Sequence, residues 1–558
     1  MHLDLRWVAG ALWKTRDVRA HLAALVTRAA AEAPERLALV EPRSGRRVTW
    51  GELDAEVECV ARGLGAMGMV AGYRVALALP NRLELVVAYL GALRAGLVVV
   101  PVNPRAATGE LVRMLVDCGA RLVLADVTTL TTVRQAVAGI QDALAGADED
   151  LRSRTAVPRV VALSAPALPG ESTYDELVGG EPEWGGAEQA GARLTDDGER
   201  LAVLLYTSGT SGRPRAAMLT HRALLANIEQ AAAVRPPMLR GDDVVLGVLP
   251  MFHVYGLNAV LGQVLWQRAR LVVLDGFDPE EALTVIEDER VTVLPVAPPV
   301  FVAWRRVPDL RQRLSGVRLV LSGSAPLPAD LVADFTGRTG LPVHQGYGLT
   351  EAAPVVTSTL CSRGGVPKPG SVGAALPGIE LRLLDETGAA RDDDARDDPG
   401  EIWLRGDNLF SGFWPDGVDG PDADGWLATG DVGILDSEGD LFLVDRVKEL
   451  VVVSGFNVYP TEVEDVIAEL GSVAEAAVIG TPDERTGEAV VAYVRPAPGS
   501  SYSDDELERQ VREQCESRLA RFKQPREIRV VEELPHTVIG KVAKGRLRAR
   551  RQEPGLLK

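Results

Sequence analysis

The feature that most constrains the fold is an alternation of apolar runs and amphipathic segments between about residue 20 and residue 350. The segment "ELVVAYLGALRAG" (84–96) has helical spacing, and the fully apolar run "LVVVPV" (97–102) follows it. A second helical segment, which Thr108 can cap, precedes the run "ARLVLAD" (120–126). Apolar strands that alternate with amphipathic helices are typical of parallel sheets covered on both faces.

The pattern recurs with a predicted helix at 279–288 and predicted strands at 291–296 and 317–321. Residues 139–200 are instead rich in Pro, Gly, Ala and acidic residues, which predicts a connection or a surface insertion. After Ser371, short strands and turns predict a small antiparallel barrel.

The last hundred residues predict a separate α+β unit. Thr461 with Glu464, and Ser503 with Glu506, have the S/T-x-x-E spacing that begins a helix. A chain of 558 residues is too long for one ordinary core, so at least two domains are expected.

Composition excludes several classes of function. The 60 basic and 78 acidic residues give a net charge of −18, which argues against a nucleic-acid partner held by general electrostatics. Four scattered cysteines and six unpaired histidines indicate neither a disulfide framework nor a zinc site. The N-terminus is charged throughout, and the apolar stretch 85–102 is interrupted by Arg94. We therefore expect no signal peptide, no integral membrane span and a cytoplasmic location.

The strongest local motif is "YTSGTSGRPRAAM" (206–218), directly after the apolar run "LAVLL". A loop of Thr, Ser and Gly lets backbone N–H groups approach an anion, and Arg213 and Arg215 add positive charge. The loop lacks the Walker A pattern, and a flexible turn is the alternative interpretation.

A second motif, "HQGYGLTEAAP" (344–354), follows a predicted strand, where α/β sheets bind ligands. Tyr347 offers a ring for stacking, Thr350 a hydroxyl for phosphate, and Glu351 an oxygen ligand for magnesium. A helix cap is the alternative interpretation of the "TE" pair.

Three further motifs lie towards the C-terminus: "TGD" (429–431), "DRVKELVVVSGFNVYP" (445–460) and "LPHTVIGKVAKGRLR" (534–548). Asp431 could accept both hydroxyls of a ribose. Taken singly, Asp431 could be an Asp in a turn, and the basic stretch 534–548 could be a solvated face.

The order and spacing of the five motifs resemble the adenylate-forming superfamily of acyl-CoA synthetases, firefly luciferases and peptide-synthetase adenylation domains. The resemblance covers nearly the whole chain, from "VTWGELDAEVECVARGL" (48–64) to "GKVAKGRLR" (540–548). It implies an N-terminal domain (1–446) of helix-covered parallel sheets with a small β-barrel. A smaller, mobile α+β domain (447–558) would follow.

The resemblance also implies roles for individual residues. Residues expected to bind ATP are Thr207, Ser208, Gly209, Thr210, Ser211, Gly212 and Arg215 at the phosphates, Gly323, Ser324, Ala325, Pro326 and Tyr347 at adenine, and Asp431 and Arg446 at the ribose. Thr350 would contact the α-phosphate, and Glu351 would hold Mg²⁺. Lys541 would reach the carboxylate and the α-phosphate, with Lys544 nearby expected to tolerate alanine. Residues expected in the second step are the hinge Lys448 and the CoA-tunnel residues Ser454, Gly455 and Phe456.

The sequence departs from the family pattern at Arg215. The phosphate loop of the family ends in Lys-Gly, and here it ends in Arg215-Ala216. Arginine keeps the charge but replaces a compact ammonium with a planar fork. The hinge position holds Lys448, as in many acyl-CoA ligases, whereas many other relatives carry Asp there.

The motif "LPMFHVYGL" (249–257) resembles the acyl-CoA ligase form and offers His253 where amino-acid-activating relatives carry Asp nearby. A neutral organic acid, fatty or aryl, is therefore expected. The candidate pocket walls are His253, Val254, Gly256, Val296, Pro298, Gly323 and Gly346, and the glycines are expected to leave depth for the acid's tail. A buried core histidine is the alternative interpretation of His253.

These features together predict an acid–thiol ligase that uses ATP, Mg²⁺ and coenzyme A. The acid would be activated to acyl-AMP with release of pyrophosphate, and the acyl group would pass to coenzyme A. Two alternatives stay open: an acyl-AMP ligase that loads a carrier-protein thiol, and an inactive nucleotide-binding homologue.

Overall fold

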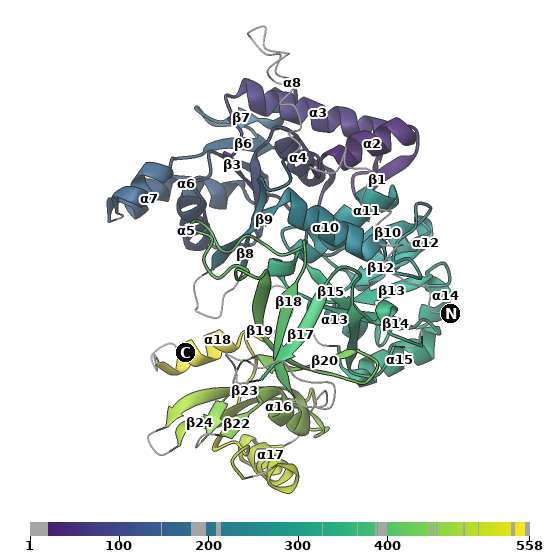
Figure 1. Cartoon of the computed structure of the whole chain (residues 1–558), viewed down its shortest axis with the longest axis vertical. Coiled ribbons are helices and arrows are strands. Elements are labelled where there is room, and N and C mark those ends of the chain that lie inside the picture. The colour runs from purple at the N-terminus through teal and green to yellow at the C-terminus, as the bar shows by residue number, and fades with distance from the viewer. Residues whose placement is uncertain are drawn as a thin grey trace.

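The computed structural model describes residues 21–146, 148–179, 197–207, 214–325, 327–364, 367–385, 388, 399–446, 449, 451–453, 456–483, 486–499, 502–519, 521–536 and 542–552. Within this part of the chain the strands form three sheets, of seven, thirteen and five strands. Figure 1 shows the seven-stranded sheet at the top, the thirteen-stranded sheet below it, and the C-terminal unit at the bottom.

The seven-stranded sheet is parallel except for its last hairpin. Its strand order is β7 (Ser172–Thr173), β6 (Arg159–Leu163), β5 (Leu122–Asp126), β3 (Arg74–Ala78), β4 (Val98–Pro101), β8 (Leu201–Thr207) and β9 (Arg215–Thr220). Along β3, Val75 and Leu77 join the core under α3 (Trp50–Ala66) and α4 (Leu83–Arg94). Ala76 and Ala78 join the core under α5 (Thr108–Cys118) and α6 (Leu130–Ala145). Both faces of this sheet are therefore covered.

The thirteen-stranded sheet has a parallel part and an antiparallel part. The parallel part contains β1 (Leu37–Glu41), β10 (Val244–Gly247), β11 (Arg270–Val273), β12 (Val293–Val296), β13 (Leu319–Ser322) and β14 (Val343–Gly348), with β2 (Arg46–Thr49) antiparallel at one edge. Its helices are α10 (His221–Ala232), η2 (Tyr255–Gly262, a π-helix), α11 (Gln263–Gln267), α12 (Pro279–Asp288), α13 (Pro298–Trp304), α14 (Leu310–Arg313) and α15 (Ala329–Thr339).

The antiparallel part continues the same sheet. Its strands are β15 (Val355–Ser358), β16 (Ser371–Ala375), β17 (Glu380–Leu384), β18 (Gly400–Arg405), β19 (Trp426–Leu435) and β20 (Leu441–Arg446). Strand β15 pairs with both β14 and β16, which joins this part to the parallel strands. Within the described residues the ladder is open at β17, which pairs with β18 alone.

The C-terminal unit has its own core. It consists of β21 (Val451–Val453), β22 (Phe456–Val458), β23 (Val473–Asp483), β24 (Gly487–Pro496) and β25 (Glu527–Val530), with α16 (Pro460–Ala468), α17 (Asp504–Arg518) and α18 (Lys544–Gln552). The remaining elements among the described residues are α2 (Ala24–Glu32), α7 (Glu149–Arg154), α8 (Tyr174–Gly179), η3 (Thr350–Ala352) and η4 (Thr359–Cys361). The predicted fold class, a large α/β domain followed by a smaller α+β domain, is confirmed.

Three local predictions were wrong. Residues 139–179 are no mere connection, because they form α7, α8 and the buried strand β6 of the seven-stranded sheet. Thr108 does not cap its helix: Ala107 is the N-cap, and the Thr108 hydroxyl bonds Gln135. Helix α16 begins at Pro460, one residue before Thr461, so that no side chain caps it. The capping box at Ser503 is confirmed.

Among the described helices, none combines the length and the apolar composition that a membrane crossing requires.

Candidate active site

The β8–β9 hairpin carries the predicted phosphate loop between its two strands. Thr207 and Arg215 face each other as the last residue pair of the hairpin. Of the predicted loop, Ser208, Gly209, Thr210, Ser211 and Gly212 lie outside the described residues, as does Pro326. The position of the hairpin is nevertheless fixed, because β8 is buried beside β4.

Arg215 lies against a segment that is distant in sequence. Its Nη2 is 2.7 Å from Asp419 Oδ2, and its guanidinium carbon is 3.8 Å from the centre of the Phe413 ring. Backbone hydrogen bonds hold this segment along β9, from Trp414 N–H to Ala216 and from Met218 N–H to Gly412. The arginine fork therefore has both an aromatic and an anionic partner, neither of which motif spacing predicted.

The "TE" pair lies at the carboxyl end of β14. Thr350 and Glu351 begin the three-residue turn η3 and are half-buried. Leu349 precedes the turn without a side-chain cap, so the helix-cap interpretation is wrong. The two side chains stand at the carboxyl ends of parallel strands, where α/β sheets bind ligands.

The predicted adenine and ribose residues meet beside this turn. The Tyr347 hydroxyl donates a hydrogen bond of 2.7 Å to Asp431 Oδ2, and both residues are buried. Asp431 on β19 pairs in register with Arg446 on β20, of which only the strand pairing is described.

The segment of Gly323, Ser324 and Ala325 follows β13, the strand next to β14. A Cβ atom added at Gly323 would lie 3.0 Å from the ring of Tyr255. The adenine candidates and the predicted acid-binding motif are therefore neighbours.

His253 is a neutral group in this site. Burial lowers its pKa to about 4, and its Nε2 has no hydrogen-bond partner among the described residues. The neighbouring Phe252 ring lies 4.5 Å away, centre to centre, and Val254 is part of the core. An uncharged imidazole provides no ionic partner for a carboxylate.

The three pocket glycines do not leave the depth that we expected. An added Cβ would lie 2.4 Å from Pro250 O at Gly256, 2.7 Å from Thr357 O at Gly346, and 3.0 Å from the Tyr255 ring at Gly323. Protein atoms already fill these positions, so the glycines permit close packing of the chain.

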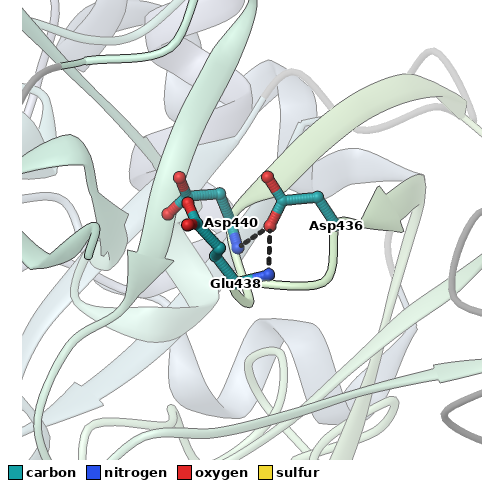
Figure 2. Close-up of side chains that lie close together, drawn as sticks. All are labelled: Asp436, Glu438 and Asp440. Carbon is teal, nitrogen blue, oxygen red and sulfur yellow. Dashed lines mark hydrogen bonds between the residues drawn. The ribbon is translucent and has the colours of Figure 1, made fainter. Parts of the chain in front are cut away.

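One group of carboxylates in the described residues is close enough to share a cation. Asp436, Glu438 and Asp440 lie together at the tip of the β19–β20 hairpin (Figure 2). The Lys368 ammonium lies 2.6, 2.5 and 3.0 Å from these three carboxylates. Its hydrogen bond to Asp436 is the main cause that raises the pKa of Lys368, so this side chain is the cation of the cluster. We therefore do not assign magnesium to it.

The C-terminal motifs are described only in part. Lys448, Ser454, Gly455 and Lys541 lie outside the described residues, and of Phe456 only the strand pairing is described. Lys544 pairs with Glu464 at 2.8 Å and with Glu449 at 3.3 Å, and its side chain is 11% exposed. That Lys544 tolerates alanine stays a prediction, but Lys544 is a poor control for Lys541, because alanine would leave two half-buried carboxylates without this partner.

A helix-covered α/β domain that carries the predicted nucleotide-binding motifs at its strand ends, followed by a small α+β domain, is the architecture of the adenylate-forming enzymes. The AMP-binding enzyme family matches residues 26–414, and its C-terminal domain matches residues 462–541. The chain belongs to this family of adenylate-forming enzymes, as the resemblance implied.

Relatives match over almost the whole chain. A "4-coumarate–CoA ligase-like 9" from Oryza sativa subsp. japonica is 34% identical over 92% of this chain and 90% of its own length. A "long-chain-fatty-acid–CoA ligase" from Bacillus subtilis is 33% identical over 94% of each chain. The solved structure of ATP-bound MatB from Rhodopseudomonas palustris matches with a TM-score of 0.81, at 32% identity over 95% of this chain and 99% of its own.

Proposed function

We propose that this enzyme uses ATP to activate a carboxylic acid as acyl-AMP, releases pyrophosphate, and then transfers the acyl group to coenzyme A. The observation that carries the proposal is that three groups lie close together where the parallel strands β13 and β14 end. These are the Thr350–Glu351 turn, the Tyr347–Asp431 pair and the His253–Tyr255 motif. The full-length similarity to CoA ligases supports the same reaction.

In the first step, a carboxylate oxygen of the acid forms a bond to the α-phosphorus of ATP. The bond from that phosphorus to the bridging oxygen breaks, and pyrophosphate leaves with the electron pair. Thr350 would donate to the α-phosphate, and Asp431 would accept the ribose hydroxyls. Lys541 would place an ammonium between the two anions that approach each other.

Glu351 fits the role of magnesium ligand. Its carboxylate is a hard oxygen donor, half-buried at the end of β14 and beside the Thr350 hydroxyl. When bound, Mg²⁺ would screen the charge of the phosphates so that a second anion can approach. The other residues expected around ATP would bind and orient the nucleotide and would exclude water from it.

In the second step, the sulfur of coenzyme A forms a bond to the acyl carbonyl carbon, its proton is lost, and AMP leaves. We propose that the domain of residues 447–558 turns about Lys448 between the two steps. Ser454, Gly455 and Phe456 would then line the path of the thiol.

The acid that this site favours is uncharged apart from its carboxylate. His253 carries no negative charge in either protonation state, so it offers no counter-charge to a substrate ammonium, unlike the Asp of amino-acid-activating relatives. Both an aryl and a fatty acid are compatible with the relatives, whose names include 4-coumarate and long-chain fatty acid. We place the reaction in the cytoplasm.

The test is pyrophosphate release with ATP, Mg²⁺ and a panel of fatty, aryl and amino acids. We expect release with a fatty or an aryl acid, and a thioester when coenzyme A is added. An enzyme that forms acyl-AMP but passes it only to a carrier protein would exclude coenzyme A as acceptor. Absence of release with every acid would favour the inactive homologue.

A further inference from the structure

The turn that carries Glu351 is held by buried amide side chains. Asn258 Nδ2 donates to Ala353 O, Asn408 Nδ2 to Ala352 O, and Asn227 Nδ2 to Val355 O, each at 2.7 Å. Val355 N–H returns a bond of 3.0 Å to Asn227 Oδ1. The three asparagines are 0–1% exposed, so water does not compete for these bonds.

Each asparagine comes from a different part of the site. Asn227 lies on α10, which directly follows β9 of the predicted phosphate loop. Asn258 lies on η2, the π-helix that begins at Tyr255 of the acid motif. Asn408 precedes the segment that contacts Arg215. Because Gln230 joins Asn227 and Asn408, at 3.3 and 3.2 Å, two of the three amides are also linked to each other.

The backbone of this turn needs such support. Ala353 has φ of +63°, a left-handed conformation that a residue with a side chain rarely adopts. A buried carbonyl oxygen that accepts no hydrogen bond is costly, because it has lost its water without gaining a donor. The backbone bonds from Phe410 N–H to Glu351 O and from Leu349 N–H to Pro354 O complete the enclosure. The amides therefore hold the turn without adding a charge to it.

We propose that Asn227, Asn258 and Asn408 are positioning residues for adenylation: they act through the backbone of residues 350–355 to hold Thr350 and Glu351 against Mg²⁺ and ATP. Asn258 also ties η2, the π-helix of the predicted acid motif, to the turn that carries Glu351. This inference rests on the proposed function. It assigns the three amides no contact with substrate.

The test replaces single amides with leucine, which has similar volume and no donor. We expect Asn258→Leu and Asn408→Leu to slow pyrophosphate release about 10–100-fold and to raise the Mg²⁺ concentration required, as for partners of metal ligands elsewhere. Thioester formation from supplied acyl-AMP and coenzyme A should stay within about twofold, since that step involves neither Mg²⁺ nor pyrophosphate.

The matched control is Gln263→Met. Gln263 is 2% exposed and donates to Ile228 O at 2.6 Å, but this amide does not bond the turn. Its variant should carry a similar folding cost and keep the Mg²⁺ requirement of the wild type. Because Asn258 and Asn408 lie on different elements, either folded variant suffices for the comparison.

A readout without turnover separates this inference from the proposed function. Binding of Mn²⁺ with ATP, followed by electron paramagnetic resonance, should weaken at least tenfold in the leucine variants and not in Gln263→Met. This result would support the inference even if no acid in the panel reacts. Unchanged Mn²⁺ binding in a folded variant, an equal loss in both half-reactions, or an equal loss in Gln263→Met would overturn it.

Discussion

The turn that carries Glu351 and the end of the β8–β9 hairpin at Arg215 are held in opposite ways. Neutral amides, 0–1% exposed, fix the turn that carries Glu351. Arg215 is held by Asp419, whose side chain is 69% exposed. Removing one partner of a buried hydrogen bond costs about 1–3 kcal/mol, whereas exposed ion pairs contribute about 0–1 kcal/mol. The turn that carries Glu351 is therefore held firmly, whereas Arg215 can exchange Asp419 for another anion.

One segment takes part in both arrangements. Asn408 and Phe410 bond the turn, while Phe413 and Asp419 contact Arg215. Phosphates of ATP would compete with the Asp419 carboxylate for the arginine. The stacking on Phe413 would keep the guanidinium oriented during that exchange.

The largest effect is expected at Glu351, on the turn that the buried amides hold. Glu351→Gln should lower pyrophosphate release by more than about 1,000-fold, because a metal ligand contributes several kcal/mol of charge stabilisation. The melting temperature should change little, since the side chain is half-buried and the amide bonds to the backbone remain. Steady-state rates with a Mg²⁺ titration measure the effect.

The control for that variant is Glu380→Gln, which removes an exposed glutamate paired with Arg405 on β18. A Glu351→Gln enzyme that releases pyrophosphate at nearly the wild-type rate would show that another group holds the metal.

Lys541→Ala should be the second-largest effect and should separate the half-reactions. A lysine between two anions in a partly dehydrated site is worth about 10²–10³ in rate, so adenylation should fall by that factor. Thioester formation from synthetic acyl-AMP should stay near the wild-type rate. Exposed Arg546 is the control, because Lys544 is ion-paired. Equal loss of both steps would contradict the assignment.

Acid should lower the free energy of unfolding through two buried histidines. The rings of His21 and His221 lie 3.9 Å apart; burial lowers the pKa of His21 to about 4 and that of His221 well below its usual value. Between pH 6.5 and 4 the unfolded chain binds more protons, so the free energy of unfolding should fall as the pH falls. The slope should reach about 1.4 kcal/mol per pH unit for each histidine.

Denaturant titrations across this pH range measure that slope. His221→Phe should flatten it, because it removes one titrating ring from the first turn of α10. A slope that is the same in the variant and in the wild type would place the acid sensitivity elsewhere.

The smallest effect is expected at the exposed ion pair between Arg215 and Asp419. Asp419→Asn should lower the KM for ATP about two- to fivefold, the scale of an exposed ion pair. Arg215→Ala should raise it, and the double variant should behave like Arg215→Ala. Asp416→Asn, an exposed aspartate of the same segment, is the control. A higher KM in Asp419→Asn would mean that Asp419 orients the arginine and does not compete with ATP.

The sequence predicted what depends on local pattern. Helix α12 has the predicted limits of 279–288, and β12 and β13 overlap the predicted strands, because apolar periodicity alone specifies them. The motif residues Tyr347 and Asp431 were identified from the resemblance, and the structure adds that they bond each other.

The rest depends on contacts between distant parts of the chain. Asn408 reaches Ala352 across 56 residues, and Asn258 reaches Ala353 across 95, with no spacing rule to predict either. The pocket depth was wrong for the same reason: what lies beside a glycine such as Gly256 is decided by the packing of other segments. The expected box at Thr461 failed because Glu464 accepts from Val478 N–H and pairs with Lys544.

The open ladder at β17 bears on self-association. An unpaired strand edge is a template for pairing with a second chain, and proteins protect such edges with charge. Glu380 and Arg382 both lie on β17; Glu380 pairs with Arg405 of β18, and Arg382 stacks on Trp426 of β19 at 3.9 Å. Docking a second copy along this edge would strip water from these two charged side chains. The edge therefore works against aggregation at the end of the longest sheet.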